Sequence, residues 1–336
     1  MPELTLHQIG PNASLQDLGR EGYLRFGLSR GGAMDRIALL EAAALLGQGL
    51  DICAVELPSA PVRLSVSAPQ RVALTGAPML AEVDGRAIQW GACHSLEAGE
   101  ILSVRPTGRG LYGYIAFGGE IETDFALGRR STHFTGGLGQ ALVSGTVLPL
   151  GADAKADAPP RRLKPDARFD GGRLRFVTGP QTGLYSEEML AAFEATRFRK
   201  SGHANRQAAK LEHDGVPFSA EGQLGIVSEV IVLGDIQMTG QGEPFVLLAE
   251  HQTMGGYPRI GAVIPQDIAR IAQANAGAEL WFERISLEEA DGLYLTEKEL
   301  LRRIRDASEP LVRDPYDMND LLGYQLISGM ITGQED

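Results

Sequence analysis

Short apolar stretches bounded by glycine, proline or other turn residues recur along the chain. They are RLSVSA (63–68), RVALTG (71–76), ILSVRP (101–106), YGYIAFGG (112–119), LRFVTG (174–179) and EVIVLGDIQM (229–238). Such runs, rich in branched and aromatic side chains, are typical of β-strands ended by turns. A doubly wound fold would instead alternate strands with helices of similar length, and the pattern lacks that alternation. The chain is therefore predicted to be mainly β, with few helices.

Helical spacing is confined to four segments. Residues 33–47 are rich in Ala and Leu, place Met34 and Leu40 on one stripe, and end at a glycine. The other three begin with residues that favour a helix start. They are 186–195 with Ser186 as its cap, 265–275 with Pro265 in its first turn, and 296–307 with a capping box of Thr296 and Glu299.

The composition changes near the middle of the chain and again near its end. Residues 151–170 are rich in Ala, Asp and Pro and lack periodicity, as expected for a linker. Beyond about residue 285 the sequence becomes polar and helical. These changes predict an N-terminal domain over residues 1–155, a second domain over 170–285, and a helical extension over 286–336.

The charge balance bears on possible partners. The 336-residue chain has 31 basic and 43 acidic residues, a net charge of −12, so it should repel nucleic acid and anionic membranes. Its first residues lack the basic and apolar regions of a signal peptide, and no apolar run approaches the length of a membrane span. A cytoplasmic protein is expected.

Several cofactor sites are not indicated. Cys53 and Cys93 are isolated in apolar surroundings, which favours buried, reduced thiols, and the six histidines have no metal-ligand spacing. The chain has no Gly-Lys dipeptide, hence no phosphate-binding loop of the GxxxxGK[ST] type, and no Met-Lys-Met sequence to carry biotin. No directly bound cofactor is predicted, and any ATP or biotin is expected on another polypeptide.

The segment GLSRG (27–31) matches Gly-x-Ser-x-Gly, the pattern of a nucleophile elbow around Ser29. That elbow needs a strand before the serine and a helix directly after it. The preceding YLRF (23–26) is short and β-like, but the helix begins several residues late and the alternating β/α pattern is missing. A glycine-rich loop before a helix is the favoured interpretation.

Five separated motifs together resemble one family. They are QDLGREGYLRFGLSRGGAMD, LGRRSTHFTGGLG, TGPQ, NRQAAKLE and VLLAEHQTMGGYPRIGAVIPQDIARIAQ, in the order and spacing of allophanate hydrolase subunit 2, also named the C subunit of 5-oxoprolinase or the antagonist of the kinase inhibitor KipI. The resemblance covers about residues 4–285. It implies two tandem cyclophilin-like β-barrel domains with a few short helices.

The same resemblance implies a function and partners. It suggests the C subunit of an ATP-dependent 5-oxoprolinase, which converts 5-oxoproline (pyroglutamate) to glutamate together with a KipI-like B subunit (allophanate hydrolase subunit 1) and a third subunit that binds ATP. Two alternatives stay open. One is the carboxyltransferase component of a biotin-dependent urea carboxylase, which would meet carboxybiotin. The other is a regulator without chemistry of its own that binds a KipI-like kinase inhibitor.

Candidate site residues come from the motifs. Arginine can clamp a carboxylate, aspartate can accept a proton, and amide, hydroxyl or main-chain N–H groups can hold an oxyanion. The predicted catalytic residues are Asp17, Arg20, Asp35 and Arg206. The predicted substrate-binding residues are Gln16, Met34, Asn205, His251, Gln252, Thr253, Gly255, Gly256 and Tyr257. No metal ligand is predicted.

The sequence departs from the family pattern at three positions near the second-domain motifs. Ala208 and Val230 stand where glycine is usual, and Asp235 stands where alanine is common. Side chains at these positions restrict the backbone. The loops there, and with them the choice of substrate, are expected to differ from those of typical members.

Overall fold

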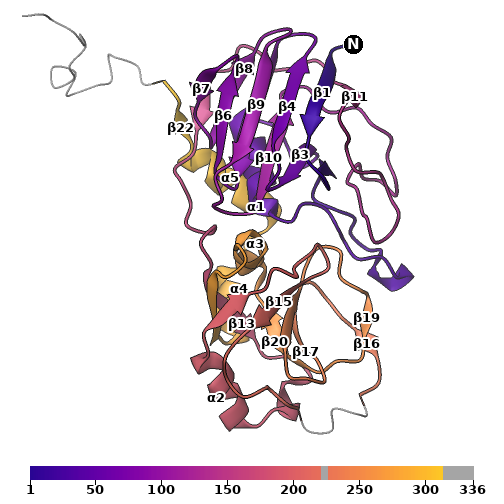
Figure 1. Cartoon of the computed structure of the whole chain (residues 1–336), viewed down its shortest axis with the longest axis vertical. Coiled ribbons are helices and arrows are strands. Elements are labelled where there is room, and N and C mark those ends of the chain that lie inside the picture. Colours follow the sequence, from indigo (N-terminus) through magenta and orange to yellow (C-terminus); the bar gives the residue numbers. More distant parts are fainter. Residues whose placement is uncertain (221–225, 313–336) are drawn as a thin grey trace, which may run out of the picture.

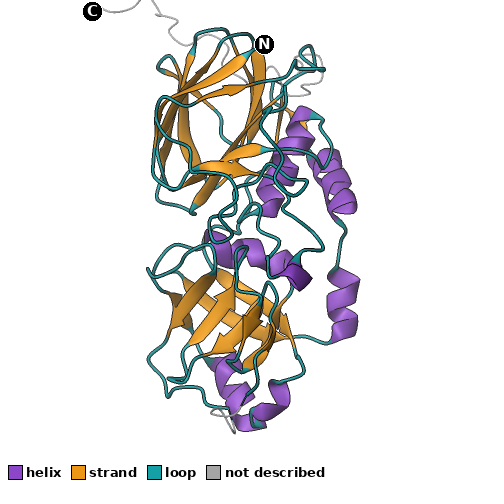
Figure 2. Cartoon of the chain, turned by 90° about the vertical axis from the view of Figure 1, so that its right-hand side faces the viewer, coloured by secondary structure: helices purple, strands orange, loops and turns teal. Residues whose placement is uncertain are grey.

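The computed structural model describes residues 1–220 and 226–312. Figure 1 shows two β-rich halves stacked end to end, and Figure 2 shows helices between them and along one side. The mainly β class predicted from the sequence is confirmed.

The N-terminal half consists of two antiparallel sheets with apolar side chains between them. One sheet contributes Leu4, Leu6, Val62 and Leu64, and the other contributes Val55, Val72 and Ile115. In order, the first sheet contains β11 (Val147–Pro149), β1 (Glu3–Ile9), β4 (Val62–Val66), β9 (Ile101–Pro106), β6 (Met79–Val83) and β7 (Arg86–Ile88). The second contains β2 (Ser14–Gln16), β3 (Ala54–Pro58), β10 (Tyr112–Phe117), β5 (Gln70–Gly76), β8 (Ala92–Leu96), β12 (Arg161–Arg162) and β22 (Glu309–Pro310).

Helix α1 (Arg36–Leu46) is buried almost all round instead of along one stripe. It packs on β5 and β10 on one side and on α5 (Glu297–Ala307) on the other. Small side chains such as Ala42 and Ala43 allow this close packing on both sides. The helix begins three residues later than the predicted 33–47, because Asp35 is its N-cap and accepts a hydrogen bond from Ala38 N.

The C-terminal half is a closed seven-stranded barrel. Its strands, in order, are β13 (Gly172–Val177), β20 (Arg259–Val263), β17 (Asp235–Met238), β18 (Pro244–Leu247), β15 (Ala208–Glu212), β14 (Phe198–Lys200) and β21 (Glu279–Arg284). Its core contains a cluster of aromatic rings, including Phe176, Phe193, Phe198 and Phe282. Helix α2 (Glu187–Ala195) contributes Phe193, while α3 (Pro265–Gln273) lies between the two halves (Figure 1).

The other three predicted helices start where expected, and the last of them, α5, returns the chain to the first half. Ser186 caps α2, Pro265 opens α3, and the capping box of Thr296 and Glu299 opens α5. A helix that was not anticipated, α4 (Leu287–Leu293), has its own capping box. Strand β22 then pairs with β12 and forms the edge of the second N-terminal sheet. The predicted extension beyond residue 312 lies outside the described residues.

Two strand predictions are wrong in detail. YLRF forms part of a 3-10 helix (Leu24–Phe26) instead of a β-like segment. EVIVLGDIQM is not one strand, because it divides into β16 (Glu229–Val230), which pairs with β19 (Met254–Gly255), and β17. The break has a local cause: the Asp235 side chain accepts a hydrogen bond from Val232 N, and Gly234 has a φ of +92°.

The predicted linker is tied to the N-terminal half at both ends. Asp153 pairs with the buried Arg71, with both side chains at most 5% exposed. Near the other end, Arg168 pairs with Asp35 at 2.8 Å and with Glu41 at 2.7 Å. Residues 151–170 therefore connect the halves along a fixed path.

A buried ion network joins the two halves directly. The guanidinium of Arg206, in the second half, pairs with Glu250 at 2.5 Å, with Glu56 of β3, and with the carbonyl of Gly32. The hydroxyl of Tyr114 donates to Glu56 at 2.6 Å, and Thr135 N donates to Glu250 at 2.9 Å. Both carboxylates therefore depend on partners from the opposite half.

Burial and pairing act in opposite directions on these groups. Burial raises the pKa of Glu56 despite the nearby Arg206. Burial would also raise the pKa of Glu250, but Arg206 and the Thr135 N–H outweigh it and lower that pKa. Removing the guanidinium would leave two carboxylates buried without their cation.

We expect Arg206→Met to lower the free energy of unfolding by about 3–5 kcal/mol, because it strands buried charges. The matched control is Arg199→Met, whose arginine forms an exposed pair with Asp214 and should change stability by about 1 kcal/mol or less. Urea unfolding of both variants measures the difference. Equal, small losses in the two variants would contradict a structural role for Arg206.

Candidate functional site

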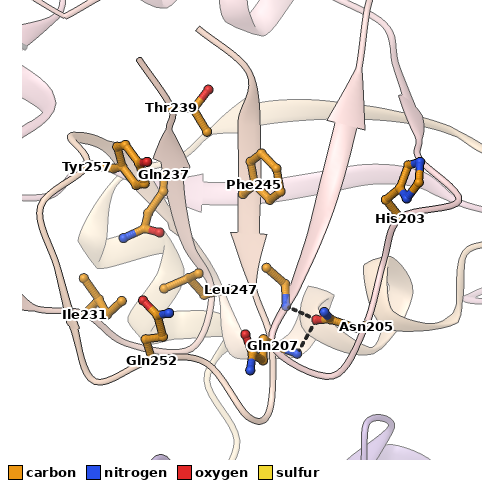
Figure 3. A pocket seen from close by; sticks show the side chains of 11 residues that line it. His203, Asn205, Gln207, Ile231, Gln237, Thr239, Phe245, Leu247, Gln252 and Tyr257 are labelled. Carbon is orange, nitrogen blue, oxygen red and sulfur yellow. Dashed lines mark hydrogen bonds between the residues drawn. The ribbon is translucent and has the colours of Figure 1, made fainter. Parts of the chain in front are cut away.

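A pocket of about 340 Å³ opens on the barrel of the C-terminal half (Figure 3). Strands β15, β17 and β18 form its floor, and the segments around residues 203–207, 231 and 252–257 form its sides. Its lining residues are His203, Asn205, Gln207, Ala208, Ile231, Gln237, Thr239, Phe245, Leu247, Gln252 and Tyr257. We refer to this cavity as the carboxamide pocket, because four of its side chains are amides.

Gln237 is the most informative residue of the carboxamide pocket. It lies on β17, the residue is 8% exposed, and its Nε2 is buried without a hydrogen-bond partner among the described residues. A buried amide donor without a partner costs about 1–3 kcal/mol, so such groups are rare unless a ligand or water satisfies them. Figure 3 shows the amide of Gln237 beside Tyr257 at the pocket wall.

Local hydrogen bonds shape the wall that carries Asn205. Its Oδ1 accepts from Gln207 N at 2.8 Å and from Ala208 N at 3.1 Å, which turns the chain into β15 (Figure 3). Gln207 in turn donates through Nε2 to Thr135 Oγ1 of the first half. Asn205 therefore holds the loop in place, and the methyl group of Ala208 adds apolar surface to the pocket.

The opposite wall is fixed by Arg259. Its guanidinium contacts the carbonyl of Val230 at 2.9 Å, Asp235 at 3.2 Å and Glu229 at 2.6 Å. Two of the family departures therefore lie in this wall: Asp235 pairs with Arg259, and Val230 is 53% exposed beside the pocket residue Ile231. The Asp235 carboxylate thus stabilises the conformation of residues 229–235.

Among the described residues, the lining of the carboxamide pocket has no Asp, Glu, Lys or Arg. Its polar groups are carboxamides, two hydroxyls and one imidazole, set among the apolar Ile231, Phe245 and Leu247. Neutral amides present a donor and an acceptor side by side. The arrangement therefore suits a small, neutral polar group that offers the complementary pair.

Only part of the predicted site lies at this pocket. Asn205, Gln252 and Tyr257 line it, and a Cβ on Gly255 would lie 2.7 Å from Gln237 Nε2, so Gly255 provides close packing beside it. Gly256 follows β19 near Ser228, and the carbonyl of Thr253 accepts a hydrogen bond from Ile231 N. His251 lines a different cavity, between the halves.

Asp17, Arg20 and Gln16 form a second, buried group in the N-terminal half. Both carboxylate oxygens of Asp17 accept main-chain hydrogen bonds, one from Gly19 N and the other from the N–H groups of residues 130 and 131. The Arg20 guanidinium donates to the carbonyls of residues 126, 129 and 131 and to Ser131 Oγ. Gln16 Nε2 donates to Ser14 Oγ and to a carbonyl. These contacts organise loops, and none of the three residues lines the carboxamide pocket.

Asp35, Met34 and Arg206 also lie away from the carboxamide pocket. The Asp35 carboxylate caps α1, pairs with Arg168 and accepts from Gln273 Nε2 at 2.8 Å. Met34 is buried, and its N–H donates to Glu56. With Arg206 held by the ion network, the structure places the predicted catalytic residues in internal contacts instead of gathering them at one open site.

Ser29 is buried and faces a histidine, but the histidine has the wrong tautomer to activate it. Ser29 Oγ lies 3.0 Å from His133 Nε2, while His133 Nδ1 accepts a hydrogen bond from Gly136 N at 2.9 Å. The proton of the neutral ring is therefore on Nε2 and points at Ser29, and burial lowers the pKa of His133. The loop interpretation of GLSRG is confirmed, since a general base needs a free Nε2 lone pair.

Other sequence expectations concern thiols, metals and membranes. Cys53 and Cys93 are buried and unpaired, as predicted. Within residues 1–220 and 226–312 no cluster of His, Cys, Asp and Glu side chains has the arrangement of a metal site. None of the helices in that same part of the chain has the length and apolarity needed to cross a membrane.

Comparison with known proteins identifies the class. The sequence profile of the carboxyltransferase domain, subdomain A and B, matches residues 26–284, and the chain belongs to that family. It is 30% identical over 299 residues to the 5-oxoprolinase C subunit of Haemophilus influenzae, covering 88% of this chain and 96% of the relative. It is 29% identical over 291 residues to the 5-oxoprolinase C subunit of Escherichia coli, covering 85% and 93%.

A solved structure supports the fold. The crystal structure of Kluyveromyces lactis urea carboxylase superposes with a TM-score of 0.78 at 21% identity, over 93% of this chain. The matched part is 31% of that much longer protein. At this identity the likeness shows a shared carboxyltransferase fold and no more.

The sequence motifs missed Gln237, together with the neighbouring pocket residues Phe245 and Leu247. Gln237 lies between Ile236 and Met238 in the short strand DIQM, whose four residues are all buried. A glutamine between these two apolar residues was the available signal. A polar residue at such a position has to find a partner or serve a ligand.

We expect Gln237→Met to leave the free energy of unfolding unchanged or to raise it by about 1 kcal/mol, because it removes a buried donor without a partner. Gln273→Met is the matched control. Gln273 is fully buried and makes four hydrogen bonds, to Leu111 N, Tyr112 N, the Tyr112 carbonyl and Asp35. Its loss should destabilise the fold by at least about 2 kcal/mol. Urea unfolding separates the two cases, and a comparable loss in both would mean that Gln237 is satisfied internally.

Proposed function

We propose that the chain is the C subunit of an ATP-dependent 5-oxoprolinase and that the carboxamide pocket receives the lactam ring of 5-oxoproline. The complex, with its A and B subunits, would open this ring by hydrolysis to give glutamate. The sequence relatives named as C subunits of 5-oxoprolinase support the class of complex. The unsatisfied amide of Gln237 carries the proposal for the pocket.

The lactam suits this lining for a geometric reason. A ring amide is held cis, so its N–H and C=O lie on the same edge. A primary carboxamide presents a donor and an acceptor that meet both groups at once. In this arrangement the Gln237 carboxamide turns from its buried position toward the ring, so that Nε2 donates to the ring carbonyl and polarises it, while Phe245 and Leu247 pack against the ring carbons.

The neutral lining also suggests that another subunit of the complex binds the charged groups of the substrates. The substrate carboxylate has no cationic partner among the described residues that line the carboxamide pocket. We therefore place it at the mouth of the pocket, where a different polypeptide of the complex completes the site. ATP is assigned to a partner polypeptide, because the chain has no phosphate-binding loop of the GxxxxGK[ST] type.

A second function fits the same pocket. Urea and the ureido ring of carboxybiotin also offer N–H and C=O groups on one edge, and relatives of this chain include urea amidolyase of Saccharomyces cerevisiae, 24% identical over 314 residues. The chain matches only 17% of that relative's length. Under this alternative the pocket would hold the carboxyl donor or acceptor of a biotin-dependent carboxyltransferase.

The test is reconstitution of the chain with homologues of the A and B subunits, followed by glutamate release from 5-oxoproline and ATP. We expect turnover by the wild type, and a fall in kcat/KM of about tenfold or more in Gln237→Met, equivalent to about 1.4 kcal/mol. Gln241→Met, at an exposed glutamine outside the pocket, should retain full activity.

Three outcomes overturn parts of this assignment. Full turnover by Gln237→Met removes the pocket from the mechanism. Carboxylation of urea with added carboxybiotin, in place of glutamate release, favours the carboxyltransferase. If the complex assembles but neither releases glutamate from 5-oxoproline nor carboxylates urea, a regulatory binding protein is favoured.

A further inference from the structure

A second, larger cavity of about 650 Å³ lies between the two halves, beside the C-terminal helices. It is walled by the loop around residues 20–30, by α1, by residues 232, 233 and 251, by the start of α3, and by residues 294–300. We call it the interdomain cavity. Its volume is within the range of about 300–1,000 Å³ that is usual for small-molecule sites.

Most of the interdomain cavity wall is apolar. Ile37 and Leu40 come from α1, Leu233 from the segment before β17, and Leu300 from α5. A smaller cavity of about 60 Å³ shares Ile37 and Leu233 and extends toward Met34 and Ile268. The space is therefore suited to a hydrocarbon group.

Two of the three arginines in the wall already have partners. Arg20 is satisfied by main-chain carbonyls and Ser131. Arg30 pairs with Glu297 at 2.5 Å and with Glu21 at 3.2 Å. These contacts neutralise Arg30 and leave neither side chain available for a ligand anion.

Arg36 is the exception. It lies in the first turn of α1, lines both cavities, and makes no hydrogen bond or ion pair with any residue in the described part of the chain. Burial and the nearby Arg30 lower the pKa of Arg36 to about 10, so it remains a cation at neutral pH. By contrast, Arg71, Arg168 and Arg175 are buried or partly buried and each pairs with a carboxylate.

His251, also in the wall, adds no charge to the cavity. Its Nδ1 lies 2.6 Å from the carbonyl of Gln252, which can only accept, so Nδ1 carries a proton. Burial lowers the pKa of His251, and the ring is neutral at pH 7. The carboxylates of Glu21 and Glu297 also line the cavity and lie close enough to act on the charge of Arg36, but both are paired with Arg30. The cavity thus combines apolar walls with one guanidinium that has no hydrogen bond or ion pair among the described residues.

We propose that the interdomain cavity binds a small amphipathic organic anion, whose carboxylate pairs with Arg36 and whose hydrocarbon part packs against Ile37, Leu40 and Leu233. A planar guanidinium forms two parallel hydrogen bonds with a carboxylate, and partial burial strengthens them. The site is separate from the carboxamide pocket and does not depend on the function proposed for it.

The two sites nevertheless share parts of their walls. Ile231 lines the carboxamide pocket and its neighbour Val232 lines the interdomain cavity. In the same way, Gln252 faces the pocket while His251 faces the cavity. A ligand in the interdomain cavity therefore contacts the same two chain segments that hold one side of the carboxamide pocket.

Octanoate is the probe, with 1-octanol as its neutral counterpart, and isothermal titration calorimetry on the full chain is the measurement. We expect saturable binding of one octanoate per chain, and at least tenfold weaker binding of 1-octanol. Arg36→Met should weaken octanoate binding at least tenfold, while its effect on 1-octanol should be small. Because Arg36 makes no hydrogen bond or ion pair within residues 1–220 and 226–312, the variant should remain folded, which thermal unfolding verifies.

Three further variants sharpen the test. Arg302→Met removes an exposed arginine elsewhere and should bind octanoate normally. Leu233→Trp fills the cavity and should abolish binding of both probes. Gln237→Met should retain octanoate binding, which distinguishes this site from the carboxamide pocket. The proposal is overturned if wild type shows no saturable octanoate binding, or if Arg36→Met or Leu233→Trp binds octanoate as tightly as wild type does.

Discussion

The pairing of Arg206 with Glu56 and Glu250 is the interaction on which the arrangement of the two halves depends. A guanidinium and two carboxylates are tolerated in a buried place only while they compensate one another. Glu56 belongs to a strand of the first half and Glu250 to the second, so separating the halves would leave each carboxylate without partners that it needs. This requirement makes the relative position of the halves specific in a way that apolar contact alone would not.

The same network fixes the walls of the carboxamide pocket. The carbonyl of Arg206 accepts from Glu250 N, and the carbonyl of Gln207 accepts from Leu248 N. The loop that carries Asn205 is thereby joined to the segment that leads to Gln252. Gln207 also reaches Thr135 in the first half. The pocket is thus built on the second barrel but held in shape by contacts across the interface.

Local sequence signals predicted the elements well wherever the cause of the structure was itself local. Capping residues such as Ser186 and Thr296 start their helices where expected, because a cap acts within four residues. EVIVLGDIQM failed as a single strand because a side-chain contact from Asp235 to Val232 N competes with the strand. The buried position of α1 was also missed, since its second covering layer is α5, more than 250 residues later in the chain.

The site was harder to predict, because residue chemistry does not reveal which partners the fold supplies. Asp17, Arg20, Asp35 and Arg206 have the side chains of a catalytic group, yet each is engaged internally. Gln237 is a neutral side chain in a buried strand, yet among the described residues that line the pocket it has a buried amide donor without a hydrogen-bond partner. Arg36 likewise lies outside the predicted site, yet it lacks an ion pair among the described residues, whereas the buried Arg71 and Arg168 each have one.

Both of our proposals therefore rest on polar groups that lack an internal partner instead of on polar groups in recognisable motifs. A family motif can be retained because it holds loops and halves together, as the Asp17 and Arg206 contacts do, and such residues are needed for any activity that the fold supports. We propose that substrate choice is instead decided where the described protein leaves hydrogen bonds or charges open. The carboxamide pocket leaves open a neutral donor, and the interdomain cavity leaves open a positive charge. Ligands of different chemistry are therefore expected at the two sites, even though residues 231–233 and 251–252 serve both.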